Sequence, residues 1–280
     1  MMSYISVFGG ANVDIIGVPE KNVRMRDSNV GRVIVRPGGV GRNIAEQLVK
    51  NGKKCRFFSV FGSDYFSAFL KDSCMQKGID ISGALSAEEN SGIYLCIHDE
   101  TGDMVAAVND MDLMQKMNIE YAESCLPAIN RSEICILDAN PPAETILFIA
   151  EHSKIPLLMD PVSCAKANRA LPVLPYLTAI KPNIYEARMM TGCHDAKECA
   201  RKLIDKGVRN AFVSLGIEGL CFADHDTCGI IAPEHVYPGP SNGAGDALCA
   251  GLAIALANGY NVKKCAEYGM SLVSEYMKTV

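Results

Sequence analysis

Residues 238–259 have the sequence Pro-Gly-Pro-Ser-Asn-Gly-Ala-Gly-Asp-Ala-Leu-Cys-Ala-Gly-Leu-Ala-Ile-Ala-Leu-Ala-Asn-Gly. A turn-forming prefix leads into a Gly-Ala-Gly-Asp step, and an almost uncharged segment of small residues follows. Gly243 and Gly245 let backbone N–H groups come close to a bound anion, and the first amides of a helix carry a partial positive charge. This stretch therefore predicts an anion-binding site at the start of a buried helix.

The acidic residue of this step, Asp246, suits a different role from anion binding. A carboxylate repels phosphate, so its useful function here is to accept the proton of a hydroxyl group that attacks phosphorus. A single Asp near a helix start can also simply complement the helix dipole. The small apolar residues that follow Asp246 favour the catalytic interpretation, because they predict a buried helix whose N-terminus lies in a cleft.

The composition fits one main α/β domain. The chain has 280 residues, of which 49% are hydrophobic and 21% charged, enough to bury a full core. Its net charge of −5 and lack of a long basic run argue against binding to nucleic acid or an anionic membrane, so the expected partner is a small molecule. The absence of a leader-like or membrane-spanning stretch gives the expectation of a cytoplasmic protein.

The cysteines and histidines indicate no metal or disulfide framework. The twelve cysteines are scattered singly through apolar runs without a Cys-x-x-Cys pair, which is typical of reduced thiols. The five histidines are isolated in turn-like settings, which favours structural or surface roles.

The middle of the chain alternates predicted strands and helices, which indicates a mostly parallel sheet covered by helices. The predicted elements span residues 55–61, 67–77, 134–138, 145–153, 155–160, 179–181, 184–191, 196–206 and 210–215. Polar clusters follow three of the strands, at 138–140, 160–166 and 181–186. Ligands bind at the carboxyl ends of strands in such sheets, so these clusters predict one side of a site.

Two further segments predict a small exposed sheet. The first strand, within residues 4–17, breaks at a Gly-Gly pair and places Asn12 and Asp14 just beyond it, and residues 30–36 then alternate polar and apolar side chains. Residues 91–108 have the pattern of a hairpin that turns at 99–102. A glycine loop at Pro37-Gly-Gly39 leads into an amphipathic helix that ends near Gly52.

Two of these motifs together resemble the signatures of the ribokinase-like (PfkB) carbohydrate kinase family. They are Pro37-Gly-Gly39 with Asn43, and Gly243-Ala-Gly-Asp246 with its Ala-rich helix. The order of the remaining motifs agrees, so the resemblance covers nearly the whole chain. It implies a three-layer fold with a mostly parallel sheet, in a single domain of residues 1–280, and a small β-sheet lid formed by about residues 15–37 and 91–110.

The resemblance also implies roles for individual residues. Asn12, Asp14, Gly38, Gly39 and Asn43 would bind sugar hydroxyls, and a carboxylate such as Asp14 can accept two hydrogen bonds from adjacent hydroxyls. Asp246 would be the base, while the amides of Asn242, Gly243, Ala244 and Gly245 would hold the transferred phosphoryl group. The lid would also pair two subunits into a homodimer.

A second group of residues would serve the nucleotide. The motif Asn183-x-x-Glu186 resembles the one whose Glu organises Mg²⁺ largely through water, although the same pair could be a helix cap. Ser214 and Gly216 would lie near the phosphates or ribose of ATP, with Gly219 shaping the turn. Whether the chain has the family's monovalent-cation site stays an open question, because Pro240 stands where many relatives have an acidic residue. Whether the adenine pocket is complete is a second open question, since the sequence ends soon after a helix predicted over 262–277.

Within the family, residues 37–43, 108–112 and 160–166 most resemble pseudouridine kinases. Asn109, Asp110 and Lys166 offer amide, carboxylate and ammonium groups that suit a base with two imide N–H groups and carbonyls. The expected reaction is ATP-dependent phosphorylation of the 5′-hydroxyl of pseudouridine. The alternatives are another sugar kinase of the ribokinase or fructokinase type, a catalytically silent sugar or nucleoside sensor on the same fold, and, more distantly, a dehydrogenase.

Overall fold

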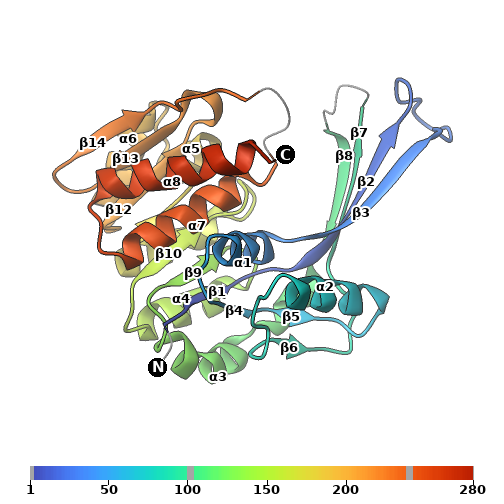
Figure 1. Ribbon diagram of the computed structural model, residues 1–280, viewed down its shortest axis with the longest axis horizontal. Helices are drawn as coiled ribbons and strands as arrows, with labels where there is room; N and C mark the ends of the chain where they lie inside the picture. Colours follow the sequence, from blue (N-terminus) through green and yellow to red (C-terminus); the bar gives the residue numbers. More distant parts are fainter. Residues whose placement is uncertain (1–2, 100–103, 238–241, 280) are drawn as a thin grey trace.

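The computed structural model describes residues 3–99, 104–237 and 242–279. A mostly parallel sheet lies between two layers of helices, and a smaller sheet projects from one side of this core (Figure 1). The predicted α/β architecture with a separate small sheet is therefore confirmed.

The central sheet has the strand order β14-β13-β12-β11-β10-β9-β1-β4. All of its pairings are parallel except those of β12 with β13 and β13 with β14. The strands are β1 (Ile5–Phe8), β4 (Cys55–Phe58), β9 (Cys135–Asp138), β10 (Leu157–Asp160), β11 (Ala179–Ile180), β12 (Asn210–Ser214), β13 (Leu220–Ala223) and β14 (Cys228–Ile231). Helices cover both faces of the sheet, which is why its strands are continuous apolar runs.

Two hydrophobic cores separate the layers. One face of the sheet packs on α1 (Val40–Lys50), α2 (Tyr65–Gln76), α7 (Ala244–Ala257) and α8 (Val262–Met277). The other packs on α3 (Ile119–Ile129), α4 (Ala143–His152), α5 (Ile184–Thr191) and α6 (Ala196–Asp205). Short 3₁₀ segments are η1 (Asp112–Lys116), η2 (Ala167–Tyr176) and η3 (Gly216–Glu218). In the described part of the chain, no helix is both long and apolar enough to cross a bilayer.

The smaller sheet has the order β3-β2-β7-β8 and occupies the segments for which we expected a lid. Its strands are β2 (Asn12–Pro19), β3 (Gly31–Gly38), β7 (Ile93–His98) and β8 (Met104–Asp110). β2 is antiparallel to β3 and parallel to β7, and β7 is antiparallel to β8. Residues 100–102 of the predicted hairpin turn lie outside the described residues. We use the name lid for the four strands β3, β2, β7 and β8. Closure of this sheet over a ligand, and the single domain over 1–280, stay predictions.

The predicted strand over 55–61 is in fact two strands. β4 ends at Phe58, and the chain then leaves the central sheet to form β5 (Val60–Phe61), which pairs with β6 (Leu85–Ser86). Between them, the carbonyl of Ser59 accepts a hydrogen bond of 3.0 Å from the Tyr121 hydroxyl. The helices η1 and α3 were not predicted from the sequence.

The helix that follows Asp246 is buried along most of its length, as predicted. Residues 247–255 of α7 are all buried, and α8 crosses it at Gly251 and Gly269. A Cβ at Gly251 would lie 2.9 Å from the Cα of Gly269, which is closer than packed carbon atoms approach. The two glycines therefore set the distance between the helices.

We expect Gly251→Ala to lower the free energy of unfolding in a urea titration. Overpacking costs roughly 1–3 kcal/mol, whereas the better helix propensity of Ala returns at most about 1 kcal/mol. Gly17→Ala is the control, because the nearest atoms to its Cβ would lie 3.8 Å away. A Gly251→Ala protein as stable as this control would contradict the packing argument.

Candidate active site

The start of α7 presents free backbone amides to a cleft. Its N-cap, Gly243, has a φ of +87°, and no side chain in the part of the chain that the structure describes caps the helix. Glycine is required here twice over, since this φ disfavours other residues and a Cβ would collide with the Tyr276 hydroxyl. That hydroxyl donates a 2.7 Å hydrogen bond to the carbonyl of Asn242 and so ties the end of α8 to the loop. Uncapped amides at a helix N-terminus can bind a phosphoryl group.

Asp246 lies in the first turn of α7 and faces the start of α1. The Asn43 side chain donates a 2.9 Å hydrogen bond from Nδ2 to its Oδ2, across 203 positions of sequence. Asp246 remains in contact with the cleft, yet protein atoms surround it closely. This burial and the charge of Asp160 raise its pKa to about 7, although Asn43, Lys181 and Arg42 partly offset the rise. A carboxylate of this kind can accept a proton near neutral pH.

A buried ion pair lies beneath the α7 N-terminus. Lys181 Nζ is 3.0 Å from Asp160 Oδ2, and both side chains are almost fully buried. Burial opposes the charge of Lys181, but Asp160 outweighs it and the pKa of Lys181 is raised. A Cβ at Gly245 would lie 3.5 Å from Lys181 Nζ, so the ammonium group is next to the proposed phosphoryl site. The pair as a whole is neutral, but it places the Lys181 ammonium group toward that site.

Asp14 extends from the base of the lid into the same cleft. Its Oδ1 accepts a 2.8 Å hydrogen bond from Asn12 Nδ2, and its Oδ2 lies 3.3 Å from Arg36 Nε. Gly38 leaves room for this carboxylate, because a Cβ there would overlap it. Gly39, with a φ of +97°, is the N-cap of α1 and packs on the backbone of residues 10 and 11.

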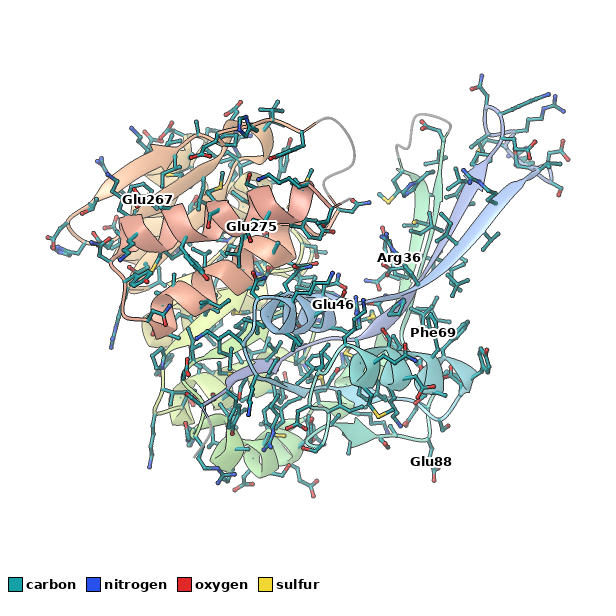
Figure 2. The ribbon with its side chains drawn as sticks, in the orientation of Figure 1. Arg36, Glu46, Phe69, Glu88, Glu267 and Glu275 are labelled. Carbon is teal, nitrogen blue, oxygen red and sulfur yellow. The ribbon has the colours of Figure 1, made fainter. Side chains whose placement is uncertain are left out.

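The cleft joins the lid base, α1 and α7 and has a volume of about 170 Å³. Figure 2 shows Arg36 at the base of the lid and Glu46 on α1. Of the residues predicted for the site, Asp14, Asn43, Asn242, Gly243 and Asp246 line it. The structure therefore brings the proposed sugar-binding and catalytic residues together.

Lys166 directly precedes η2 and is not among the residues that line this cleft. Its Nζ donates a 2.6 Å hydrogen bond to Asn140 Oδ1, and Asn140 in turn donates 2.9 Å to Asp138. Burial lowers the pKa of Lys166, and the Asp138 charge partly offsets this effect. Asn140 packs against Gly10, two residues before Asn12. Lys166 is thus linked through Asn140 to the loop that precedes Asn12.

Asn109 and Asp110 lie on opposite faces of the lid. Asp14 pairs with Tyr94 across the strands, and Tyr94 pairs with Asn109, so all three lie on one face, the inner face. Asp110 pairs with Ile93, which pairs with Val13, on the outer face. Side chains alternate along a strand, so Asn109 and Asp110 point to opposite faces, and their binding to one ligand stays a prediction.

Asn183 and Glu186 form the helix cap that was the alternative to a role in Mg²⁺ binding. Asn183 caps α5, and Glu186 closes a capping box by accepting 2.8 Å hydrogen bonds from the backbone N and Nδ2 of Asn183. Burial and the charge of Asp160 raise the pKa of Glu186. Each carboxylate oxygen keeps a lone pair, so outward contacts through water are compatible with the cap.

The predicted nucleotide loop adjoins this cap. Ser214 forms an isolated parallel bridge with Asn183, and its N–H donates a 2.9 Å hydrogen bond to the carbonyl of Pro182. Gly216, with a φ of +62°, faces open space. Gly219, with a φ of +105°, lies against the backbone of Ile231 and sets the turn between β12 and β13. Pro240, on which the question of a monovalent-cation site depends, lies outside the described residues.

Six cleft residues had no predicted role in the sequence, namely Arg36, Arg42, Glu46, Gln47, Lys50 and Tyr276. Arg42 and Glu46 are spaced i,i+4 after the glycine loop, and this spacing was a usable signal for a pair beside the site. Arg36 and Tyr276 had no such signal, because each reaches the cleft through packing of distant elements.

The comparisons with known proteins agree with this geometry. The model of the pfkB family carbohydrate kinases matches residues 2–277. Pseudouridine kinase from Escherichia coli strain K12 is 30% identical over 286 residues, which cover 98% of this chain and 91% of that protein. The crystal structure of ribokinase from Thermotoga maritima gives a TM-score of 0.88 at 24% identity, covering 97% of this chain and 92% of that chain.

Arabidopsis thaliana ribokinase complexed with ribose and ATP gives a TM-score of 0.84 at 18% identity, covering 98% of this chain and 92% of that chain. These two structures confirm the ribokinase-like fold. Together with the match over residues 2–277, they lead to one conclusion: the chain belongs to the pfkB family of carbohydrate kinases.

Proposed function

We propose that this kinase transfers the γ-phosphoryl group of ATP to the 5′-hydroxyl of pseudouridine. The observation that carries the proposal is the placement of Asp246, a carboxylate with a pKa of about 7, between uncapped helix amides and the sugar-binding Asn43. A base, an anion site and an acceptor site are then next to one another. The choice of pseudouridine is supported by the 30% identity to a pseudouridine kinase.

In the proposed reaction, Asp14 and Asn12 bind the sugar hydroxyls at the base of the lid. Asn43 holds Asp246 in place, and Asp246 accepts the proton of the attacking hydroxyl. The amides from Gly243 to Gly245 stabilise the transferred group, and the Lys181 ammonium adds positive charge beside them. Most of the rate enhancement then comes from alignment and anion stabilisation, because phosphoryl transfer has a loose transition state.

The residues present fit ATP with Mg²⁺. Glu186 would hold the ion through water, since its carboxylate oxygens already accept hydrogen bonds from Asn183, and Mg²⁺ commonly keeps several waters. Ser214 and Gly216 would lie beside the nucleotide, where the open space around Gly216 leaves room. When bound, Mg²⁺ would neutralise charge on the phosphate oxygens.

The base of the nucleoside would be recognised by Asn109 from the inner face of the lid and by Lys166 from the strand ends. Pseudouridine has an N1–H group that uridine lacks, and the Asn109 carbonyl can accept a hydrogen bond from it. The Lys166 ammonium can donate to a base carbonyl. Asp110 lies on the outer face and is left out of this part of the proposal.

A homodimer through the lid is the second part of the proposal. The outer face carries an apolar row in which Ile15 pairs with Val35 and Leu95, and Leu95 pairs with Val108. Val108 is 65% exposed and Val33, on the same face, is 71% exposed. Contiguous exposed apolar residues of this kind mark association surfaces.

We expect Asp246→Asn to abolish nearly all turnover while the dissociation constant for the nucleoside changes by only a few-fold. The amide keeps the shape of the side chain but cannot accept the proton. Coupled-enzyme kinetics and calorimetric titration measure the two quantities. Retention of a tenth or more of wild-type turnover would exclude the base role.

The pH profile of the wild-type enzyme provides the control for this assignment. Asp246 must be ionised to act, so kcat/KM should fall as the pH drops through the pKa of about 7 and level off above it. A profile that stays flat from neutral pH down to the ordinary range of a carboxyl would show that Asp246 is not the titrating base.

We expect kcat/KM for pseudouridine to exceed that for uridine by about ten- to a hundred-fold, because an unpaired buried acceptor costs roughly 1–3 kcal/mol. Asn109→Ala and Lys166→Ala should shrink this preference, and the neighbouring Asp110→Ala should leave it unchanged. The assay panel also includes ribose, fructose and adenosine. Equal turnover of uridine and pseudouridine would reject the substrate, and no turnover of any acceptor would favour a silent sensor.

The dimer is tested by light scattering after size-exclusion chromatography. We expect the double substitution Leu95→Glu with Val108→Glu to convert a dimer into a monomer, because each buried charge would oppose association. Ile230→Glu is the control, since this residue is 47% exposed on an edge strand of the central sheet. A wild-type protein that is monomeric at micromolar concentration would exclude the interface.

A further inference from the structure

We propose that Arg42 is a positioning residue that fixes the orientation of the Asn43 amide toward Asp246, and that Glu46 holds Arg42 in place for this purpose. The inference deepens the proposed function, because it rests on Asp246 as the base. Arg42 and Glu46 lie in the first two turns of α1 and support Asn43 within the same site.

The guanidinium group of Arg42 is held at each of its nitrogens. Nη1 donates a 2.8 Å hydrogen bond to Glu46 Oε2, Nε donates 3.1 Å to the carbonyl of Gly38, and Nη2 donates to Asn43 Oδ1. The side chain is only 6% exposed. A planar, buried guanidinium that is bonded at all three nitrogens is a rigid donor.

This donor decides which way the Asn43 amide points. An asparagine side chain has an acceptor oxygen and a donor NH₂ group at nearly equivalent positions. Arginine can only donate, so Asn43 Oδ1 must face Arg42 and Nδ2 must face Asp246. With Arg42 removed, the amide is free to turn its oxygen toward Asp246, and that arrangement would favour the protonated acid.

Glu46 keeps Arg42 anchored over the whole working pH range. Its carboxylate also accepts contacts from Lys50 at 2.9 Å and Lys77 at 3.3 Å through Oε1. Burial opposes its ionisation, but the hydrogen bonds from Arg42 and Lys50 outweigh burial and lower the pKa of Glu46 to about 2. The anchor is thus ionised wherever Asp246 titrates.

Other charged groups also face Asp246 and must be separated from the effect of Arg42. Asp160 raises its pKa, Lys181 lowers it, and the hydroxyl of Tyr276 lies beside Gly243. Asp14, Arg36, Glu46 and Lys50 line the same cleft. None of them bonds Asn43 in the described residues, so the route through the amide is specific to Arg42.

The experiment follows the ionisation of Asp246 directly, through the pH dependence of its ¹³Cγ resonance in protein labelled with [¹³C]aspartate. The signal is assigned by its loss in Asp246→Asn. We expect Arg42→Met to raise the midpoint by about one pH unit, which corresponds to the loss of one hydrogen bond to a charged group. Lys77→Met is the control, because it removes a cation from Glu46 without contact to Asn43, and its midpoint should equal that of the wild type.

The same substitution in an Asn43→Ala background separates the amide from the plain charge of Arg42. If Arg42 acts through Asn43, Arg42→Met should shift the midpoint much less in that background. Shifts of equal size in both backgrounds, or no shift in either, would overturn the proposal. Where Arg42→Met fails to fold, Arg42→Lys serves instead, because it keeps the buried charge but loses the planar fork.

Kinetics supply the second readout. The acid limb of kcat/KM should move to higher pH in Arg42→Met, and activity should recover toward the wild-type value at alkaline pH. The resonance titration needs no turnover, so an inactive wild-type protein would count against the proposed function and leave this test of Arg42 intact. An acid limb that coincides with that of the wild type would overturn the positioning role.

Discussion

One buried carboxylate, Asp138, joins two of the segments that form the cleft, the base of the lid and α1, to the end of β9. Its Oδ2 accepts hydrogen bonds from the backbone N–H groups of Gly10 at 2.8 Å and Gly41 at 2.9 Å. Gly10 belongs to the turn from the central sheet into the lid, and Gly41 to the first turn of α1. Burial raises the pKa of Asp138, while these backbone hydrogen bonds and those from Asn140 oppose the rise. The lid base and α1 are therefore fixed relative to the end of β9.

Both α1 and α7 begin at a glycine N-cap, which has no side chain to bind the first amides. The hydrogen bonds of Asp138 explain why the first amides of these two helices nevertheless have different partners. At α1, Asp138 and the carbonyl of Gly10 occupy the amides of Gly41 and Arg42. At α7, no side chain among the described residues takes this place, so the first amides are available to the cleft. The first amides of α1 are thus bonded within the protein, whereas those of α7 are available to bind a ligand.

The electrostatics of the site depend on the same arrangement. Asp160 repels both Asp246 and Glu186, and the buried Lys181 offsets part of that repulsion. The strand ends bring these groups together from three separate segments of sequence. Burial, together with the charge of Asp160, raises the pKa of Asp246 to about 7, which is suited to proton transfer near neutral pH.

Much of the fold and part of the site could be predicted from local sequence. The apolar runs predicted the parallel sheet, the small residues after Asp246 predicted a buried helix, and the Asn183-x-x-Glu186 spacing indicated a cap. Such features depend on neighbours within a few positions, so the sequence by itself determined them. The division of Asn109 and Asp110 between two faces of the lid depends on strand pairing. Likewise, only the tertiary structure decided that Asn43 meets Asp246 across 203 positions, because that contact arises from the packing of α1 on α7 and has no local signal.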